Sequence, residues 1–259
     1  MIKLFSDGQE VQFSTTIFPD QTSQVWKVDR NALSPEGDTY ILWLFESEAE
    51  LVHVVQLARL LQVEYEIHPD LVAPYLPYGR QDKDISNEAS FALEVVKDIL
   101  YNANICRIES FDPHSKTDMV FSDSYALETV GKFHSEILNH DVICYPDKGA
   151  RDRYGAYGLP TVYCEKVRNQ QTGEILGLNL VSGNVDIRNK RILIIDDICD
   201  GGMTFIKVAE VLKTWTPHID LAVSHGLFSK GKQVLHDAGI VNIFTTNSLL
   251  RNPEGFQVW

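Results

Sequence analysis

The chain has 259 residues, of which 44% are hydrophobic and 23% are charged, and its formal net charge is −13 at pH 7. No apolar run reaches the ~18–20 residues that a membrane-spanning helix needs, and the acidic balance lacks the clustered Lys and Arg of a nucleic-acid-binding surface. Because the first residues, MIKLFSDGQE, do not have the pattern of a signal peptide, we expect a cytoplasmic protein without membrane or nucleic-acid partners. The chain is long enough for two modest domains or one large domain.

Apolar segments with strand-like and helix-like spacing alternate along the chain. The expected strands, in chain order, lie at residues 40–45, 72–73, 106–109, 142–145, 161–164, 192–195 and 221–224. The expected helices lie at residues 49–61, 91–100 and 123–138, and a further helix begins at Met203. Strands that alternate with helices predict parallel sheets with helices on both faces. Ligands of such sheets bind beyond the carboxyl ends of the strands, so the loops after those ends are the candidates for a site.

The stretch ILIIDDICDGGMTF, residues 192–205, places three acids and two glycines at the end of a buried strand. The glycines allow a ligand close to the backbone, and the unpaired N–H groups at the start of the next helix attract phosphate. The acids would repel phosphate, so we expect them to hold hydroxyl groups or a metal. Ribose 5-phosphate offers both chemistries, whereas the simpler alternative is an Asp that caps an ordinary strand–helix turn. The candidate residues are Asp196, Asp197, Asp200, Gly201, Gly202, Met203 and Thr204.

A second glycine-containing segment, GLFSKGKQ at residues 226–233, follows the expected strand at 221–224. It matches the phosphate-binding pattern G-x-x-x-x-G-K-[ST] except at the last position, where Gln233 replaces the hydroxyl residue that should contact Mg²⁺. No further strand ending in an acid is left to complete such a site. We therefore do not predict a P-loop.

The motif LIIDDICDGGMT resembles the phosphoribosyl-pyrophosphate loop of the type I phosphoribosyltransferase fold. Other segments resemble the ribose-phosphate pyrophosphokinase family and occur in its order: PYLPYGRQDK (74–83), FDPHS (111–115), YPDKGARDR (145–153), CEKVR (164–168) and SHGLFSKG (224–231). This resemblance implies two phosphoribosyltransferase-like α/β domains, each a mostly parallel sheet flanked by helices. Residues 1–125 would form the ATP side and the assembly contacts, and residues 126–259 would carry the ribose-phosphate loop.

The resemblance also implies roles for individual residues. Lys166 and Arg168, at a strand-to-loop transition, would be catalytic and bring two positive charges to the β-phosphate, and the loop that follows at residues 169–174 would close over the site. Asp147 would help to hold Mg²⁺, and His114 would contact the metal–ATP complex. The ATP contacts would be Phe18, Asp20, Arg80, Gln81 and His114, and the diphosphate loop would be Asp147, Lys148 and Gly149. Without the resemblance, Arg80 would be read as a partner of a surface ion pair, His114 as an exposed loop residue, and Lys166 and Arg168 as a solvated charge pair.

The sequence departs from the family pattern at several points. Spacing to Arg80 assigns the adenine-binding segment to residues 18–20, which leaves Gln21 and Thr22 where Gly and Glu are usual. The loop reads DGGMT where the family more often has DTGGT, so one hydroxyl donor is missing. The sequence also ends at Trp259, earlier than is usual for the family, so the resemblance leads us to expect that part of the usual assembly surface is missing.

The expected reaction is Mg²⁺-dependent transfer of the β,γ-diphosphate of ATP to the 1-hydroxyl of ribose 5-phosphate. One alternative is the same transfer to a bulkier ribose derivative such as ADP-ribose. Another is a type I phosphoribosyltransferase that consumes phosphoribosyl pyrophosphate, and a third is a catalytically silent subunit. The resemblance further implies self-association, with a dimer as the smallest competent unit and a hexamer as the usual assembly.

Overall fold

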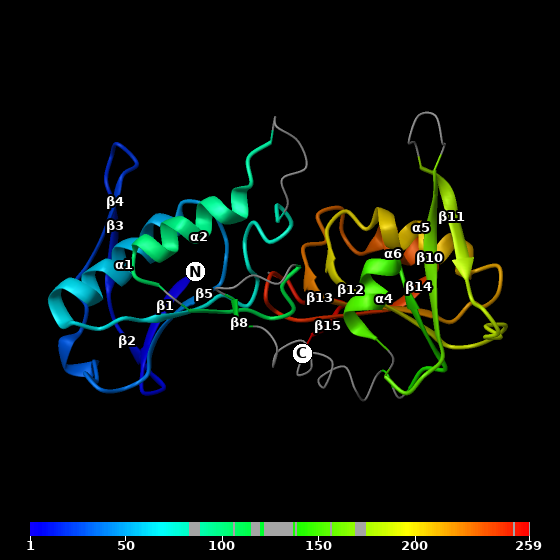
Figure 1. Cartoon of the computed structure of the whole chain (residues 1–259), viewed down its shortest axis with the longest axis horizontal. Coiled ribbons are helices and arrows are strands. Elements are labelled where there is room, and N and C mark those ends of the chain that lie inside the picture. Colours follow the sequence, from blue (N-terminus) through cyan, green and yellow to red (C-terminus); the bar gives the residue numbers. More distant parts are fainter. Residues whose placement is uncertain are drawn as a thin grey trace. The chain divides into compact units, whose positions relative to one another are not determined.

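The structure is a computed structural model of the whole chain, and it describes residues 1–82, 89–105, 107–114, 120–121, 137, 139–155, 157–168, 175–250 and 252–258. The chain divides into two compact units, Met1–Ala126 and Leu127–Trp259 (Figure 1). Each unit has its own sheet and its own hydrophobic core. The expected helix at residues 123–138 and Cys106 lie outside the described residues, apart from Ile137.

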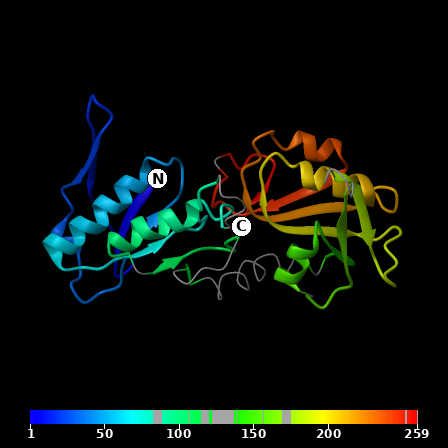
Figure 2. The ribbon, with the colours of Figure 1, turned by 45° about the horizontal axis from the view of Figure 1, so that its top comes forward.

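The first unit is built on a six-stranded sheet in the order β2-β1-β5-β6-β7-β8. Its strands are β1 (Ile2–Ser6), β2 (Gln9–Val11), β5 (Thr39–Trp43), β6 (Asp70–Val72), β7 (Ile108–Glu109) and β8 (Val120–Phe121). Pairing is parallel from β5 to β8 and antiparallel at β1 and β2. Helix α1 (Glu50–Tyr65) connects β5 to β6, and α2 (Ala92–Asn102) lies between β6 and β7 in the chain. The two helices lie side by side in both ribbon views (Figure 2).

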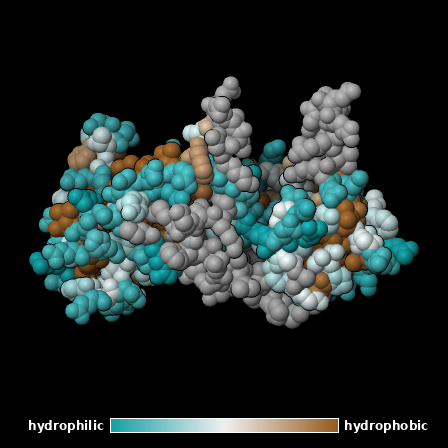
Figure 3. Space-filling view, viewed as in Figure 1, coloured by the Kyte–Doolittle hydropathy of each residue, from teal (hydrophilic) through white to brown (hydrophobic). Residues whose placement is uncertain are grey.

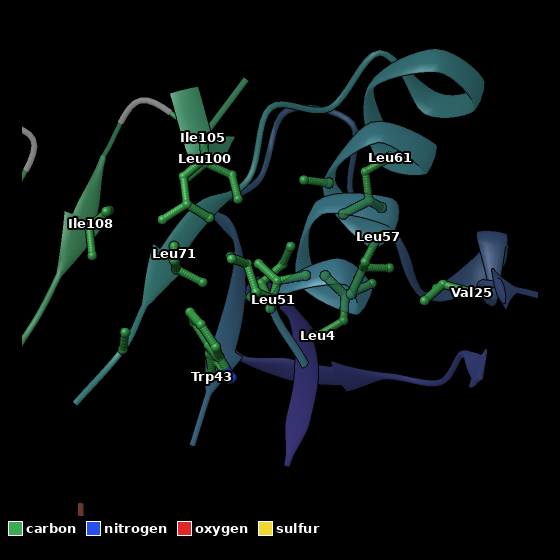
Figure 4. Packing of buried hydrophobic residues seen from close by; sticks show 14 of the residues in the cluster. Leu4, Val25, Trp43, Leu51, Leu57, Leu61, Leu71, Leu100, Ile105 and Ile108 are labelled. Atoms are coloured by element: carbon green, nitrogen blue, oxygen red, sulfur yellow. The ribbon is translucent and has the colours of Figure 1, made fainter. Parts of the chain in front are cut away.

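The core of the first unit lies between α1 and the sheet. Leu57 and Leu61 of α1 are fully buried with Leu4 of β1 and Leu71 of β6 (Figure 4). A short 3₁₀ helix, Arg30–Ala32, and a separate hairpin of β3 (Ser14–Ile17) and β4 (Ser23–Trp26) complete the unit. The hairpin is fastened to α1, because the amide of Val25 donates to the side chain of Gln56 at 2.8 Å.

The second unit has a seven-stranded sheet in the order β11-β10-β9-β12-β13-β14-β15. Its strands are β9 (Val142–Tyr145), β10 (Thr161–Arg168), β11 (Ile175–Val181), β12 (Ile192–Cys199), β13 (Ile219–Gly226), β14 (Ile240–Thr245) and β15 (Gln257–Val258). Only β11 is antiparallel to its neighbour. Helices α4 (Lys148–Tyr154), α5 (Met203–Leu212) and α6 (Gln233–Asp237) connect the strands.

Strand β12 is buried on both faces, as its uninterrupted apolar run predicts. Ile192 and Ile194 pack in one cluster with Phe205 of α5, whereas Leu193 and Ile195 pack in another with α4. Helices therefore cover both faces of this sheet, and the predicted α/β class with mostly parallel sheets is confirmed. Hydrophilic residues occupy much of the surface in view, and hydrophobic residues form small patches (Figure 3).

The order of the strands places a switch point in the second sheet. From β9 the chain moves to β10 on one side and later returns to β12 on the other side. The loops after β9 and β12 therefore diverge at the carboxyl edge, which is where open parallel sheets bind ligands. In the part of the chain that the structure describes, no helix combines the length and apolar character needed to cross a membrane.

Candidate active site

The loop between β12 and α5 ends in an uncapped helix terminus. Gly202 is the residue before α5, and no side chain caps the helix there. The first hydrogen bond of the helix runs from the amide of Ile206 to the carbonyl of Gly202, at 2.9 Å. The amides of the three helix residues before Ile206 thus have no acceptor within the helix, and the exposed Met203 and Thr204 are among them. This terminus can bind an anion.

The two glycines of this loop differ in backbone conformation and in the space available for a side chain. Gly202 has a φ of +77°, and a Cβ there would lie 2.8 Å from a methyl carbon of Leu235 in α6, so the fold itself requires glycine. Gly201 has no positive φ, and its nearest neighbour would be the stem of Lys230 at 3.5 Å, an ordinary contact. The fold does not require glycine at position 201, and the bare backbone there leaves room for a ligand.

Asp196 and Asp197 lie near the end of β12 and are largely enclosed by protein. Asp197 is buried, and its amide donates to the carboxylate of Asp196 at 3.0 Å. Burial, and then repulsion from Asp197 and Asp147, raise the pKa of Asp196 to about 8. The pair therefore holds a proton tightly in the free protein, and ligands that donate hydrogen bonds or bring positive charge would favour its ionised form.

The loop after β9 brings a further acid to this place. Strand register pairs Ile194 of β12 with Cys144 of β9, so Asp196 is level with the residue just before Asp147. The Asp147 side chain caps α4 by accepting a hydrogen bond from the amide of Ala150 at 3.0 Å. Lys148 and Gly149 follow and are exposed. The structure thus unites the predicted diphosphate loop with the acids of β12.

Asp200, the third acid of the motif, has a different environment. Its carboxylate accepts a hydrogen bond from the hydroxyl of Ser229 at 2.6 Å, in the segment that follows β13. The amides of Leu227 and Phe228 donate to the carbonyl of Cys199 at 2.9 and 3.2 Å. Sequence reasoning did not assign Ser229 to the site. Two signals were present: Ser229 follows an expected strand, and it lies in the segment SHGLFSKG that carries part of the family resemblance.

Lys166 and Arg168 lie in the last part of β10. Their backbones pair with Leu178 and Ile175 of β11. The structure does not describe their side chains, and the expected closing loop at residues 169–174 lies outside the described residues. Their catalytic role therefore stays a prediction.

In the first unit, the predicted ATP contacts after β6 and β7 lie near each other. A Cβ on Gly79 would lie 3.9 Å from the Cβ of His114, and the amide of Phe111 donates to the carbonyl of Pro74 at 3.0 Å. Arg80 and Gln81 are exposed next to this contact. Among the described residues, Arg80 forms no ion pair, so the simpler reading of it as a surface ion-pair partner finds no support.

Phe18 and Asp20 lie at the tip of the hairpin between β3 and β4. The Asp20 carboxylate accepts hydrogen bonds from the hydroxyl and the amide of Thr22, at 2.7 and 3.1 Å, which lower its pKa. Phe18 is 41% exposed.

The described residues contain no group of three His, Cys, Asp or Glu side chains arranged to hold a metal ion. The two residues expected near a metal, His114 and Asp147, belong to different units. The placement of Mg²⁺ therefore stays a prediction.

Comparisons with known proteins agree with this architecture. Residues 150–258 match the family model described as "Phosphoribosyl transferase domain". The ribose-phosphate pyrophosphokinase of Saccharolobus solfataricus is 25% identical over 251 residues, covering 86% of this chain and 85% of the relative. That of Pyrococcus furiosus is 27% identical over 240 residues, covering 83% and 84%. The phosphoribosylpyrophosphate synthetase of Mycobacterium smegmatis shares the fold, with a TM-score of 0.78, 22% identity and coverage of 98% of this chain and 87% of that one.

The two loop glycines should respond differently to the same substitution. Gly202→Ala should lower the free energy of unfolding by about 2 kcal/mol, because alanine disfavours a positive φ and its Cβ would meet Leu235. Gly201→Ala should change it by less than about 0.5 kcal/mol. Urea denaturation of both variants checks this, and an equal loss in the two would contradict the distinction.

Asp196→Asn should change how stability depends on pH. The folded state keeps a proton on Asp196 up to about pH 8, whereas the unfolded chain loses it near the ordinary value of 3.8. The unfolded state binds fewer protons between these values, so this group makes stability fall as pH rises from about 4 to 8. The variant cannot ionise and should lack that fall.

The measurement is the free energy of unfolding at pH 5 and pH 8, without divalent ions. Relative to wild type, Asp196→Asn should gain more than about 1 kcal/mol between the two pH values. Asp237→Asn, an exposed acid of the same unit, is the control and should follow wild type. Parallel profiles for wild type and Asp196→Asn would show that the carboxylates are not crowded as described.

Proposed function

The chain belongs to the ribose-phosphate pyrophosphokinase family, and on that premise we propose that it transfers the β,γ-diphosphate of ATP to the 1-hydroxyl of ribose 5-phosphate. The products would be phosphoribosyl pyrophosphate and AMP. One observation carries the proposal. Acids that can hold hydroxyl groups and a bare helix terminus that can hold a phosphate occur together at the carboxyl end of β12. Ribose 5-phosphate needs both kinds of partner.

On the acceptor side, the helix terminus at Met203 would bind the 5-phosphate through its free amides. Asp196 and Asp197 would accept hydrogen bonds from the 2- and 3-hydroxyls. Burial and mutual repulsion make the ionised acids unfavourable in the free protein, and hydroxyl donors relieve part of that cost. The site therefore favours a phosphorylated sugar over a simple phosphate.

On the donor side, Arg80 and Gln81 would hold the ATP phosphates, and an Arg suits this because its guanidinium binds them bidentately. The 1-hydroxyl oxygen would attack the β-phosphorus in line. The bond from that phosphorus to the α,β-bridging oxygen would break, AMP would leave with the oxygen, and the hydroxyl proton would pass to solvent. Lys166 and Arg168 would neutralise charge at the β-phosphate, so catalysis would consist mainly of positioning and electrostatics.

A magnesium ion fits this arrangement. Mg²⁺ prefers carboxylate and phosphate oxygens, and Asp147 presents a carboxylate beside Asp196, whose ionised form is favoured by added positive charge. His114 would contact the metal–ATP complex on the donor side. When bound, the ion supplies charge neutralisation to the phosphates.

The alternatives differ in what they need from the chain. A phosphoribosyltransferase would have no use for the ATP-side segments, and the proximity of the Arg80 segment to His114 therefore disfavours it. A silent subunit would have no reason to keep Lys166, Arg168 and the acids of β12. Transfer to a bulkier acceptor such as ADP-ribose keeps the same reaction and is separated from the first proposal only by the acceptor.

AMP release in the presence of an acceptor tests the proposal. Wild type with ATP and Mg²⁺ should release AMP when ribose 5-phosphate is added, and ADP-ribose serves as the second acceptor arm. Lys166→Ala should lower turnover by orders of magnitude and leave ATP affinity nearly intact, because its charge acts mainly in the transition state.

Lys190→Ala removes an exposed charge in the loop before β12 and should keep full turnover. No AMP with either acceptor would refute diphosphate transfer. Lost ATP binding in Lys166→Ala, without a separate loss of turnover, would remove its catalytic role.

We further propose that the chain self-associates and shares its ATP site between subunits, with the hairpin tip reaching a neighbour's Arg80 and His114. The exposed Phe18 supports this. Subunits carrying Phe18→Ala and Asp20→Ala should be weak, as should Arg80→Ala subunits. A mixture of the two should regain about a quarter of wild-type turnover, because random two-fold pairing makes half of the dimers mixed, with one intact site each.

Subunit exchange is verified by native mass spectrometry of the mixture. If the subunits exchange and activity does not return, or if a monomer is fully active, the shared site is wrong.

A further inference from the structure

The segment GLFSKGKQ, residues 226–233, is not a P-loop, but it lies beside the loop between β12 and α5, residues 200–202, which is the phosphate loop of the proposed function. It begins at the end of β13, where Gly226 is paired with Cys199 of β12. Backbone bonds from Leu227 and Phe228 and the hydroxyl of Ser229 fasten it to Cys199 and Asp200. These contacts fix the backbone directly before the next residue, Lys230.

Lys230 lies directly against the bare backbone of Gly201. A Cβ built on Gly201 would be 3.5 Å from the Cε atom of Lys230 and 3.6 Å from its Cδ atom. The ammonium nitrogen is one bond beyond Cε, so it also lies close to Gly201. The side chain is exposed, and within the described part of the chain no carboxylate is paired with it.

The second lysine of the segment is oriented differently. The ammonium of Lys232 donates to the carbonyl oxygen of Glu254 at 2.8 Å and lies 5.7 Å from the ring centre of Phe256. It fastens the loop before β15 and is already engaged. Of the two lysines, only Lys230 flanks the phosphate loop.

Two separate positive features therefore surround the loop. The free amides of α5 begin at Met203, after Gly202, whereas the Lys230 ammonium lies beside Gly201. One phosphate on the helix terminus uses the amides and leaves the lysine to a neighbouring anion. Asp196, Asp197 and Asp200 make the surroundings negative, so an added anionic group needs a cation of its own there.

We propose that Lys230 binds the second phosphate of an acceptor whose ribose carries a diphosphate on its 5-carbon. The inner phosphate would occupy the α5 terminus and the outer phosphate would contact Lys230, with the glycine at 201 leaving space between them. This inference rests on the proposed function, because it extends the acceptor of the same site. On this inference, Lys230 raises the affinity for an acceptor with a 5-diphosphate and not for one with a 5-monophosphate.

Equilibrium binding to the full chain tests the inference, with ribose 5-phosphate and ADP-ribose as the two probes in isothermal titration calorimetry. Lys230→Gln should weaken ADP-ribose binding about tenfold, as expected for the loss of one charge-assisted hydrogen bond. Ribose 5-phosphate binding should change by less than about twofold. The loss for ADP-ribose should shrink at high salt, because the contact is exposed.

Lys213→Gln is the matched control, since it removes the same charge at the far end of α5, ~15 Å along the helix. It should leave both affinities unchanged, and thermal melting should show that both variants fold. An equal loss of affinity for both probes would show that Lys230 contacts the inner phosphate. No loss for either probe would show that Lys230 contacts neither phosphate. Both results overturn the inference, and so does a wild type that does not bind ADP-ribose. Failure of the proposed function is separate, because it appears as absent AMP release by wild type with either acceptor.

Discussion

The crowding of carboxylates at the carboxyl edge of the second sheet is the constraint on which the candidate site depends. Asp196 and Asp197 lie in the last half of β12, a strand buried on both faces, and the neighbouring strand β9 ends two residues before Asp147. In these surroundings a negative charge is poorly solvated and is repelled by the next, which explains the raised pKa of Asp196. A polyhydroxyl ligand would supply hydrogen-bond donors to these carboxylates, and a cation would supply positive charge; either one would favour their ionised forms.

The phosphate loop complements these acids because it offers the opposite charge within a few residues. Its amides come from an uncapped helix, and its shape comes from a glycine that packing against Leu235 makes obligatory. In the segment after β13, the hydroxyl of Ser229 donates a hydrogen bond to the carboxylate of Asp200, and the side chain of Lys230 lies next to Gly201. The groups that we propose bind the hydroxyls and those that we propose bind the phosphate thus occupy adjacent parts of one strand–loop–helix unit.

The first unit, for which we propose ATP binding, also carries candidate residues in loops after parallel strands. Its parallel strands also end in loops that carry the charged residues, and the turns after β6 and β7 bring Arg80 near His114. The tip of the hairpin between β3 and β4 exposes the aromatic residue Phe18. This exposed aromatic residue is the structural reason for proposing a site shared between subunits.

The sequence by itself determined the α/β class, because buried strands and amphipathic helices leave clear periodicities, and it determined the acid–glycine motif at the end of β12. It did not reveal β1 to β4, β8, β11, β14 or β15. Most of these strands have five residues or fewer, too short for a clear periodicity, whereas β11 and β14 have seven and six residues and were also missed. Only the tertiary structure decided that Asp147 lies beside Asp196, that Gly202 but not Gly201 is required by packing, and that Lys230 flanks the phosphate loop. Each of these depends on which strands are neighbours in the sheet, and that order is set by long-range packing and not by any local pattern of residues.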